Sequence, residues 1–399
     1  MNLTKREVAG VVVVGALSLG CAAYVAMPEE TEHVINVAME EIAPGDHDTL
    51  APHSNCIAIT DIPLDTQIGS LVLPMAAASE LDALEQTMVS LNISNFTLLG
   101  HPEDVVMYHD TPTAFSLATN SIVDVTEADN SVATTFALDE EGGTVQRVNK
   151  LENGAHILPS AQEMSLKTPE EITQIFRLHG DYLASLGVTT VFGPVTDVGT
   201  QGADGSRSFS DDPQIMTEAA MAVIEGLRQA GIHATVKHLP DYGQSPKNSD
   251  LEVTSVPSIS ALEQFSLGSI SEVLTGSHPT YAMTGNYLIP GLSDGIPASL
   301  NPAVYTYIRD RMGFEGTFIT DALNAGSIQS YTGLAPIPSQ ARASVEALNA
   351  GADIVIISLD ASQAVVAGIQ QALSSGSVSE ATINRASTNA LEAKGYDIC

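Results

Sequence analysis

The chain has 399 residues, of which 44% are hydrophobic and 16% are charged, so it can bury a sizeable core and is not an intrinsically disordered protein. Its 48 acidic residues outnumber its 15 basic residues and give a formal net charge of −33. Such a surface repels phosphate backbones, which argues against nucleic-acid binding and favours a salty or extracellular setting.

A targeting segment is predicted at residues 1–27. Lys5 and Arg6 precede an apolar run from 8 to 27, the pattern of a signal peptide or of an uncleaved membrane anchor. Cys21 ends a stretch that resembles a lipoprotein cleavage box, except that Ser18 stands where Leu is usual, so lipidation of Cys21 is a third alternative. Residues 28–64 are acidic, contain Pro and are typical of a linker. We therefore expect an exported protein that is extracellular or held at the cell surface.

From residue 65 onward, short apolar segments alternate with amphipathic ones. The strands are expected at 70–76, 95–100, 133–138, 189–194, 234–238, 281–284, 317–320 and 353–358. The helices are expected at 79–91, 169–186, 213–230, 260–274, 302–312, 340–350, 361–374 and 379–394. Several helices are followed by Gly, which ends a helix cheaply in the left-handed conformation. The strands are apolar throughout, as expected when both faces of a sheet are buried.

This alternation predicts an α/β fold, a single-domain (β/α)8 barrel of the TIM type over residues 65–399. A doubly wound open sheet is the alternative, and the absence of a Gly-x-Gly-x-x-Gly segment after an early strand argues against it. In a closed barrel the first strand and the last helix are neighbours, so we predict a disulfide between Cys56 and Cys399. The alternative is two unrelated thiols.

Charged residues follow several of the expected strands. They are Asp139, Arg147, Asp197, Arg207, Lys237, His238 and Asp321. The carboxyl ends of barrel strands converge on one mouth, where such a set can bind several hydroxyls of a sugar. Taken singly, each has a simpler interpretation: Asp321, for example, could only cap the next helix. The scattered His and Cys residues have no metal-ligand spacing, so we expect no metal site.

The segments around these residues resemble the family 3 glycoside hydrolases, specifically their β-N-acetylhexosaminidase branch, from about residue 68 to 394. DEEGGTVQR at 139–147 is similar to the family's DQEGGRVQR, and FGPVTD at 192–197 is similar to FAPVxD. RSF at 207–209 matches, KHLPDYG at 237–243 resembles KHFPGxG, and ITDALN at 319–324 resembles the nucleophile segment.

The resemblance implies that Asp321 is the nucleophile of a retaining glycosidase that acts on amino-sugar glycans and needs no cofactor. It also implies that the remaining charged residues bind the sugar hydroxyls: Asp139, Arg147, Asp197, Arg207, Lys237 and His238.

One motif departs from the family. The branch has Asp-Ser-His on the loop after the fifth strand, where the His is the acid/base, and this chain has Asn248-Ser249-Asp250. Asp250 could act as the general acid, or Glu252 or Asp241 could replace it. Alternatively, leaving-group protonation is lost and the protein is a catalytically impaired carbohydrate-binding relative. A β-glucosidase or glycosyl-transferring variant is a third alternative.

Overall fold

The computed structural model describes residues 56–100, 112–130, 132–149, 156–203 and 205–399. The predicted targeting segment at 1–27 and most of the predicted linker at 28–64 lie outside these residues. Within the described ranges no helix combines the length and the apolar character needed to cross a membrane.

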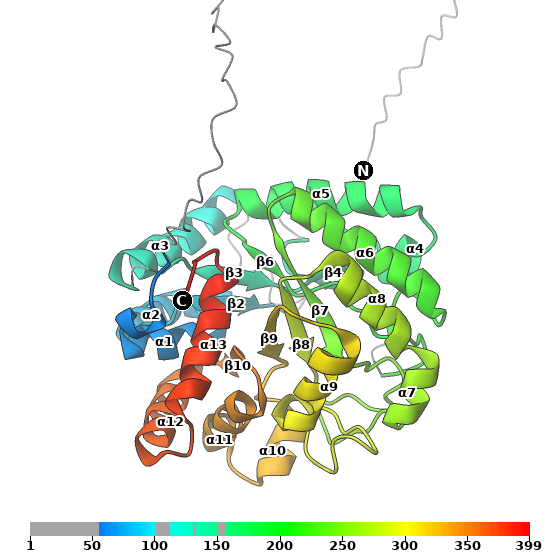
Figure 1. The fold of residues 1–399 in the computed structure, drawn as a ribbon. Coiled ribbons are helices and arrows are strands. Elements are labelled where there is room, and N and C mark those ends of the chain that lie inside the picture. Colours follow the sequence, from blue (N-terminus) through cyan, green and yellow to red (C-terminus); the bar gives the residue numbers. More distant parts are fainter. Residues whose placement is uncertain (1–55, 101–111, 131, 150–155, 204) are drawn as a thin grey trace, which may run out of the picture. The chain divides into compact units, whose positions relative to one another are not determined.

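Eight parallel strands form the centre of the fold (Figure 1). Their order is β10, β1, β2, β3, β6, β7, β8, β9, so that the strands follow one another in chain order and the last strand, β10, pairs with the first, β1. A bridge between Ile319 and Ile354 joins the two edge strands and completes the ring. The predicted barrel is therefore confirmed. The strands are β1 (Val72–Ala77), β2 (Asn95–Leu99), β3 (Thr135–Leu138), β6 (Thr190–Val191), β7 (His233–Leu239), β8 (Tyr281–Thr284), β9 (Thr317–Thr320) and β10 (Val355–Ser358).

Helices surround this sheet and bury its outer face (Figure 1). Several of them begin with Pro at a first-turn position, which needs no backbone N–H donor there. The longer ones are α1 (Leu64–Ser70), α2 (Leu81–Ser90), α3 (Pro112–Asn130), α5 (Pro169–Ser185), α6 (Pro213–Gln229), α7 (Ile259–Phe265), α8 (Leu267–Ser277), α9 (Pro302–Met312), α10 (Gly326–Thr332), α11 (Pro336–Ala350), α12 (Ser362–Ser375) and α13 (Glu380–Glu392). Shorter ones are α4 (Ala161–Met164), η1 (Ile59–Asp61), η2 (Ala78–Glu80), η5 (Gly205–Arg207), η6 (Ala298–Leu300) and η7 (Leu359–Ala361).

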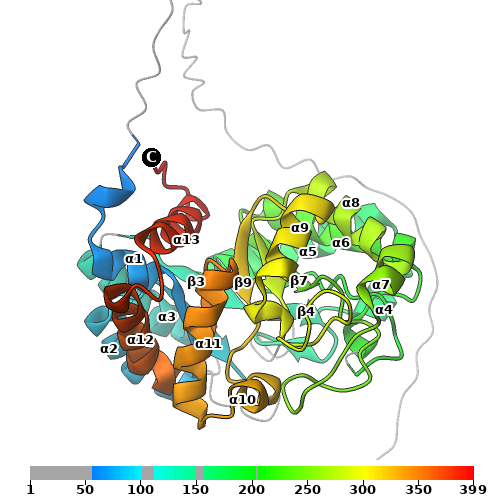
Figure 2. The same cartoon turned by 60° about the horizontal axis from the view of Figure 1, so that its bottom comes forward.

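Several local features differ from the sequence prediction. The helix expected at 260–274 is two helices, α7 and α8, which meet at the buried Ser266. Helix α3 completes the alternation between β2 and β3, and α10 packs beside α11 (Figure 2); neither was expected. A small antiparallel hairpin, β4 (Glu140–Gly142) and β5 (Val145–Gln146), branches off after β3. This hairpin carries part of the polar set described below.

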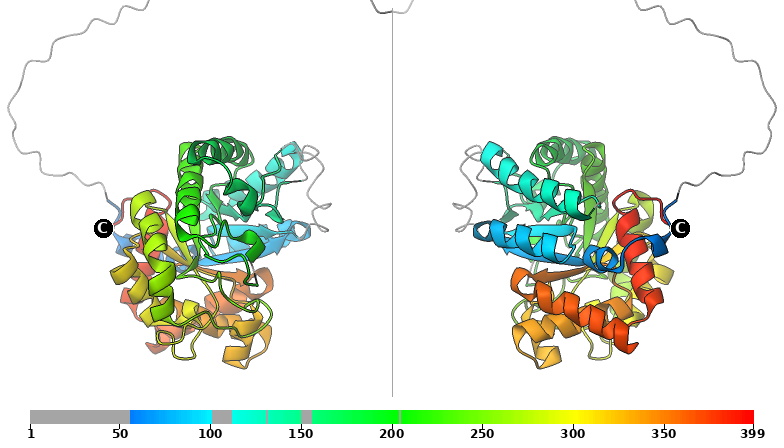
Figure 3. Two further views of the ribbon diagram at one scale, coloured as in Figure 1. Left: turned by 90° about the vertical axis from the view of Figure 1, so that its right-hand side faces the viewer. Right: turned by 90° about the vertical axis from the view of Figure 1, so that its left-hand side faces the viewer.

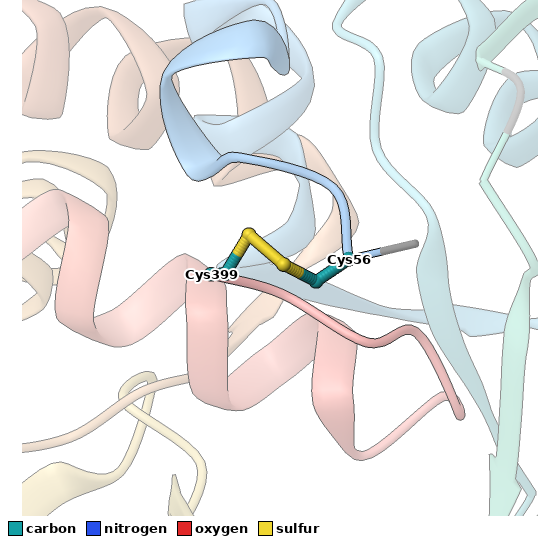
Figure 4. The surroundings of a disulfide bond; sticks show 2 residues. All are labelled: Cys56 and Cys399. Atoms are coloured by element: carbon teal, nitrogen blue, oxygen red, sulfur yellow. A yellow bond between two sulfur atoms is a disulfide. The ribbon is translucent and has the colours of Figure 1, made fainter. Parts of the chain in front are cut away.

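The two ends of the described chain are joined to each other. Helices α1 and α13, drawn blue and red, lie side by side in Figure 3. Ile57 forms a parallel bridge with Ile398, and Cys56 is bonded to Cys399, as predicted (Figure 4). The linker expected over 28–64 therefore extends too far, because residues from 56 onward belong to the barrel. Their partners are supplied by the last residues of the chain, which a local pattern cannot show.

Candidate active site

A pocket of about 230 Å³ opens at the carboxyl ends of the strands. This volume is below the roughly 300–1,000 Å³ of drug-sized ligand pockets, so it suits one sugar ring better than a long chain. Seven of the eight predicted site residues line it: Asp139, Arg147, Arg207, Lys237, His238, Asp250 and Asp321. Its apolar surface comes from strand residues, Met75, Met283 and Ile356 among them. The barrel therefore brings the predicted polar set together.

Lys237 is the centre of the charged cluster. Its side chain is 2% exposed, and its ammonium group donates to Asp139 at 2.7 Å and forms a second ion pair with Glu141. Arg147 binds the other oxygen of Asp139 at 2.8 Å. Burial alone would raise the pKa of Asp139, but Lys237 and Arg147 outweigh it and hold the pKa far below its usual value. Asp139 is therefore ionised, which makes it a strong acceptor for sugar hydroxyls.

Glu141 is a site residue that the sequence analysis missed. Its carboxylate accepts two hydrogen bonds of 2.8 Å from Arg207, from Nε and from one terminal nitrogen. Burial would raise its pKa, but Arg207 and Lys237 lower the pKa to about 2. Such a bidentate pair fixes the plane of the guanidinium group, so Glu141 sets how Arg207 faces the pocket. The only available signal was its place beside Asp139 in the quoted motif.

Asp197 lies behind His238 instead of lining the pocket. It is 2% exposed, and its carboxylate binds Nδ1 of His238 at 2.7 Å and the backbone N–H of the same residue at 3.1 Å. Burial alone would lower the pKa of His238, but Asp197 outweighs it and the net pKa is raised. Asp197 thus orients the imidazole and favours its charged form, while His238 itself faces the pocket.

Asp321 directly follows β9 and is half-buried at the pocket. Its backbone N–H donates to the carbonyl of Thr284 at 2.9 Å, and its Oδ1 accepts the N–H of Ala322 at 2.7 Å. The buried Asn286 donates to the carbonyl of Ala322 at 2.7 Å. Asp321 contributes to raising the pKa of His238, which places the two side chains within electrostatic reach of each other. The strand end therefore presents a carboxylate on a fixed backbone.

Asp250 has an exposed side chain, lines the pocket and sits on a backbone that is held on both sides. Its N–H donates to Oδ1 of Asn248 at 2.7 Å, and its carbonyl accepts the N–H of Gly326 at 2.7 Å. Gly326 begins α10, five residues after Asp321. The loop that carries Asp250 is thus bonded to the segment that follows Asp321, so the two carboxylates share one pocket.

Two tyrosines complete the pocket and were also missed. Tyr242 and Tyr287 both line it and stack on each other, with ring centroids 5.1 Å apart. The Tyr242 hydroxyl accepts the N–H of Ser249 at 2.8 Å and donates to the carbonyl of Lys247 at 2.7 Å. Tyr242 therefore anchors the loop that carries Asp250. Among the residues that the structure describes, no cluster of three or more His, Cys, Asp or Glu side chains is arranged to hold a metal ion.

A parallel barrel whose mouth gathers carboxylates, cationic groups and aromatic rings over a small pocket is the arrangement of a glycosidase. The chain belongs to glycosyl hydrolase family 3: residues 63–392 match the model described as the glycosyl hydrolase family 3 N terminal domain. The resemblance seen in the motifs is confirmed.

Named relatives and solved structures agree with this family. The beta-hexosaminidase LpqI of Mycobacterium tuberculosis is 31% identical over 272 residues, which are 65% of this chain and 67% of that protein. The crystal structure of a family 3 glycosyl hydrolase from Mycobacterium smegmatis superposes with a TM-score of 0.74 at 28% identity, covering 85% of this chain and 99% of that one. A family 3 beta-N-acetylglucosaminidase from Paenibacillus sp. has a TM-score of 0.74 at 23% identity, covering 84% of this chain and 63% of that one, and shows the fold alone.

Proposed function

We propose that this glycosidase is exported and releases terminal β-linked N-acetylhexosamine with retention of configuration. The observation that carries the proposal is that Asp321 lines the same small pocket as Asp139, Arg147, Lys237 and His238. A sugar ring bound by those four side chains lies over the carboxylate at the end of β9. The relative named beta-hexosaminidase supports an amino sugar as the substrate.

In the proposed mechanism Asp321 attacks the anomeric carbon and forms a glycosyl-enzyme, which water then hydrolyses. The C–O bond to the leaving group breaks as the new bond to Asp321 Oδ forms. Asp250 gives the departing oxygen its proton, because it occupies the loop position of the family's acid/base and lines the same pocket. In the second step Asp250 takes a proton back from the attacking water.

One observation favours a second candidate, a carbohydrate-binding protein with impaired hydrolysis. The side chain of Asp250 is exposed, whereas a carboxylic acid that protonates a leaving group near neutral pH usually lies in apolar surroundings. General acid catalysis typically contributes about 10²–10⁴-fold, and its loss would spare only substrates with activated leaving groups.

The experiment compares 4-nitrophenyl β-N-acetylglucosaminide, its β-glucoside analogue and the disaccharide of β-1,4-linked N-acetylglucosamine. We expect hydrolysis of both amino-sugar substrates, and a loss of at least about 10³-fold in kcat for Asp321→Asn, because the nucleophile is removed. Asp310→Asn, an exposed substitution on α9, is the matched control and should retain full activity. Unchanged turnover in Asp321→Asn would contradict the nucleophile assignment.

The substrate panel also separates the alternatives. Turnover of the nitrophenyl amino sugar alone, without the disaccharide, indicates that leaving-group protonation is missing. Faster turnover of the β-glucoside indicates a β-glucosidase. Sugar binding without turnover of any substrate identifies the carbohydrate-binding protein.

Export is part of the same proposal. Lys5 and Arg6 before the apolar run at 8–27 support it, and so does the Cys56–Cys399 bond, since structural disulfides persist in oxidising compartments. Expression of the full chain in a bacterial host, followed by fractionation and mass spectrometry of the N-terminus, distinguishes a cleaved signal peptide, lipidation at Cys21 and a retained anchor. Recovery in the cytoplasm with two free thiols would contradict export.

A further inference from the structure

The loop after β6 (residues 192–203) and the loop after β7 (residues 240–250) touch along their backbones. A Cβ atom on Gly243 would lie 2.4 Å from the carbonyl oxygen of Val198. A Cβ on Gly199 would lie 2.5 Å from the carbonyl oxygen of Gly243. Cβ atoms do not approach backbone that closely, so glycine is needed at both positions. The contact between the two loops is therefore built into the sequence.

Two buried carboxylates join these loops reciprocally. Asp197, on the first loop, accepts the backbone N–H of Tyr242 on the second loop at 2.9 Å. Asp241, on the second loop, accepts the backbone N–H of Val198 on the first loop at 3.1 Å, and that of Gly243 at 2.9 Å. Asp197 is 2% exposed and Asp241 1% exposed. We call this pair of carboxylates the carboxylate clasp.

The clasp holds both parts of the site that act on the sugar. On one side, Asp197 binds the ring and the backbone of His238. On the other side, Asp197 accepts the N–H of Tyr242. The hydroxyl of Tyr242 binds the backbone of Ser249 and Lys247, and so holds the loop that ends at Asp250. A change at Asp241 is thus transmitted to the imidazole and to the proposed acid without a direct contact to the sugar.

We propose that Asp241 is a positioning residue for hydrolysis: its neutral form holds the two loops together and places His238 and Asp250, and its ionisation beside Asp197 loosens both. The inference rests on the proposed function for its effect on turnover. Asp241 is a departure of this chain from the family motif quoted above, KHFPGxG, which has Gly at this position.

The surroundings of Asp241 make its charge depend on pH near neutrality. Burial raises its pKa most and the neighbouring Asp197 raises it further, while hydrogen bonds from Ser266, Gly243 and Val198 lower it, and the pKa comes to about 7. The titratable and charged groups around it are Asp197, His238, Tyr242 and Tyr287, with Arg207 and Asp321 acting on His238. From the junction of α7 and α8 the facing group is the uncharged Ser266 hydroxyl, which donates to Oδ2.

The direction of the pH effect follows from this pKa. The pKa of Asp241 is higher in the closed clasp than in a solvated loop, so the closed clasp binds the proton more tightly. Below a pH of about 7 the carboxyl is neutral, and its Oδ1 still accepts the N–H groups of Val198 and Gly243. Above that pH the buried charge and its repulsion by Asp197 outweigh the stronger hydrogen bonds, and the clasp weakens.

The experiment measures kcat/KM on 4-nitrophenyl β-N-acetylglucosaminide from pH 5.5 to 8.5 for the wild type and three variants. Asp241→Asn copies the shape of the neutral acid, so the ratio of its activity to that of the wild type should be about one at pH 5.5 and about ten at pH 8.5, where the wild type carries the buried charge. Ser266→Ala removes a hydrogen bond that lowers the pKa of Asp241 and should move the transition to higher pH. Asp211→Asn is the matched control, since Asp211 accepts bonds from Thr200 in the same region but lies outside the clasp. It should leave the profile unchanged.

A readout without substrate separates this inference from the proposed function. Hydrogen exchange of peptides covering 197–198 and 241–250, corrected for the intrinsic pH dependence, should show protection that is lost above pH 7 in the wild type and kept at all pH values in Asp241→Asn. If this pH-dependent protection is found but no substrate is hydrolysed, the proposed function is overturned and the clasp is retained. An Asp241→Asn to wild-type activity ratio that is equal at both pH values or falls below one at pH 8.5, or an unmoved profile in Ser266→Ala, would reduce Asp241 to a structural residue and overturn the inference.

Discussion

The barrel holds a buried lysine at one end and a half-buried lysine at the other, and their surroundings give them opposite properties. Lys237 lies at the carboxyl end of the strands between the carboxylates of Asp139 and Glu141. Lys394 follows α13 at the amino end, where its ammonium group donates to the carbonyl and hydroxyl of Ser94 at 2.7 Å and to the carbonyl of Ala133 at 2.9 Å. One lysine has charged partners, and the other has only neutral ones in these contacts.

Burial lowers the pKa of both lysines, and their neighbours decide the difference in charge between them. Burial lowers the pKa of Lys237, but Asp139 and Glu141 outweigh it and the net pKa is raised. Burial lowers the pKa of Lys394 to about 7, and the more distant Glu127 offsets little of it. Lys237 therefore stays a cation that can donate to sugar hydroxyls. Lys394 instead holds together the segments that precede β2 and β3.

The largest expected effect is that of Lys237→Met. It removes the cation that Asp139 and Glu141 share and leaves each carboxylate with one arginine, so we expect a loss of about 3–5 kcal/mol in the free energy of unfolding, and loss of sugar binding. Urea denaturation and calorimetric titration with N-acetylglucosamine measure the two effects. Lys394→Met leaves no carboxylate without an ion-pair partner and should bind the sugar normally. Lys247→Met, at an exposed position on the loop after β7, controls for the loss of a positive charge alone. Normal sugar binding by Lys237→Met would contradict the role of Lys237 in binding sugar hydroxyls.

A smaller effect is expected when the disulfide at the amino end is removed. Cys56 and Cys399 are 343 residues apart, and breaking such a link typically costs about 2–4 kcal/mol, chiefly through the freedom gained by the unfolded chain. The double variant Cys56→Ser with Cys399→Ser should unfold at lower temperature in calorimetry and keep its kcat at 25 °C, since the pocket lies at the other end. A reduced kcat in the folded variant would show that the two ends are coupled.

The sequence predicted the pocket end well because its signals are local. Asp139 and Asp321 each come directly after an apolar strand, and parallel strands bring such residues to one mouth. The spacing did not reveal which way each side chain faces, however. Asp197 also follows a strand, yet its partners are His238 and the N–H of Tyr242, so it faces away from the pocket.

Contacts between distant segments could not be predicted from local patterns. Asp241 bonds to Ser266 and Tyr287, which lie 25 and 46 residues further along the chain. The break between α7 and α8 falls at that same Ser266, in a stretch whose periodicity alone predicts one helix. The pairing of Ile57 with Ile398 spans almost the whole barrel, so residues with a linker-like composition became part of the fold.

The smallest expected effect is a pH dependence of stability that arises from Lys394. Its pKa is about 7 in the folded protein and 10.5 in the unfolded chain. Between these values the unfolded chain binds more protons, so this residue makes stability rise as the pH increases from about 7 towards 10, by about 1 kcal/mol after allowance for relaxation. Denaturation of the wild type at pH 7 and pH 9 should show this gain relative to Lys394→Met, whose side chain does not titrate. Lys237 has a raised pKa and gives no such gain, since its stabilisation is already complete at pH 7 and is lost only at strongly alkaline pH. If the free energy of unfolding changes equally with pH in the wild type and in Lys394→Met, the amine of Lys394 keeps its proton, as that of Lys237 does. The contrast between the two lysines would then not hold.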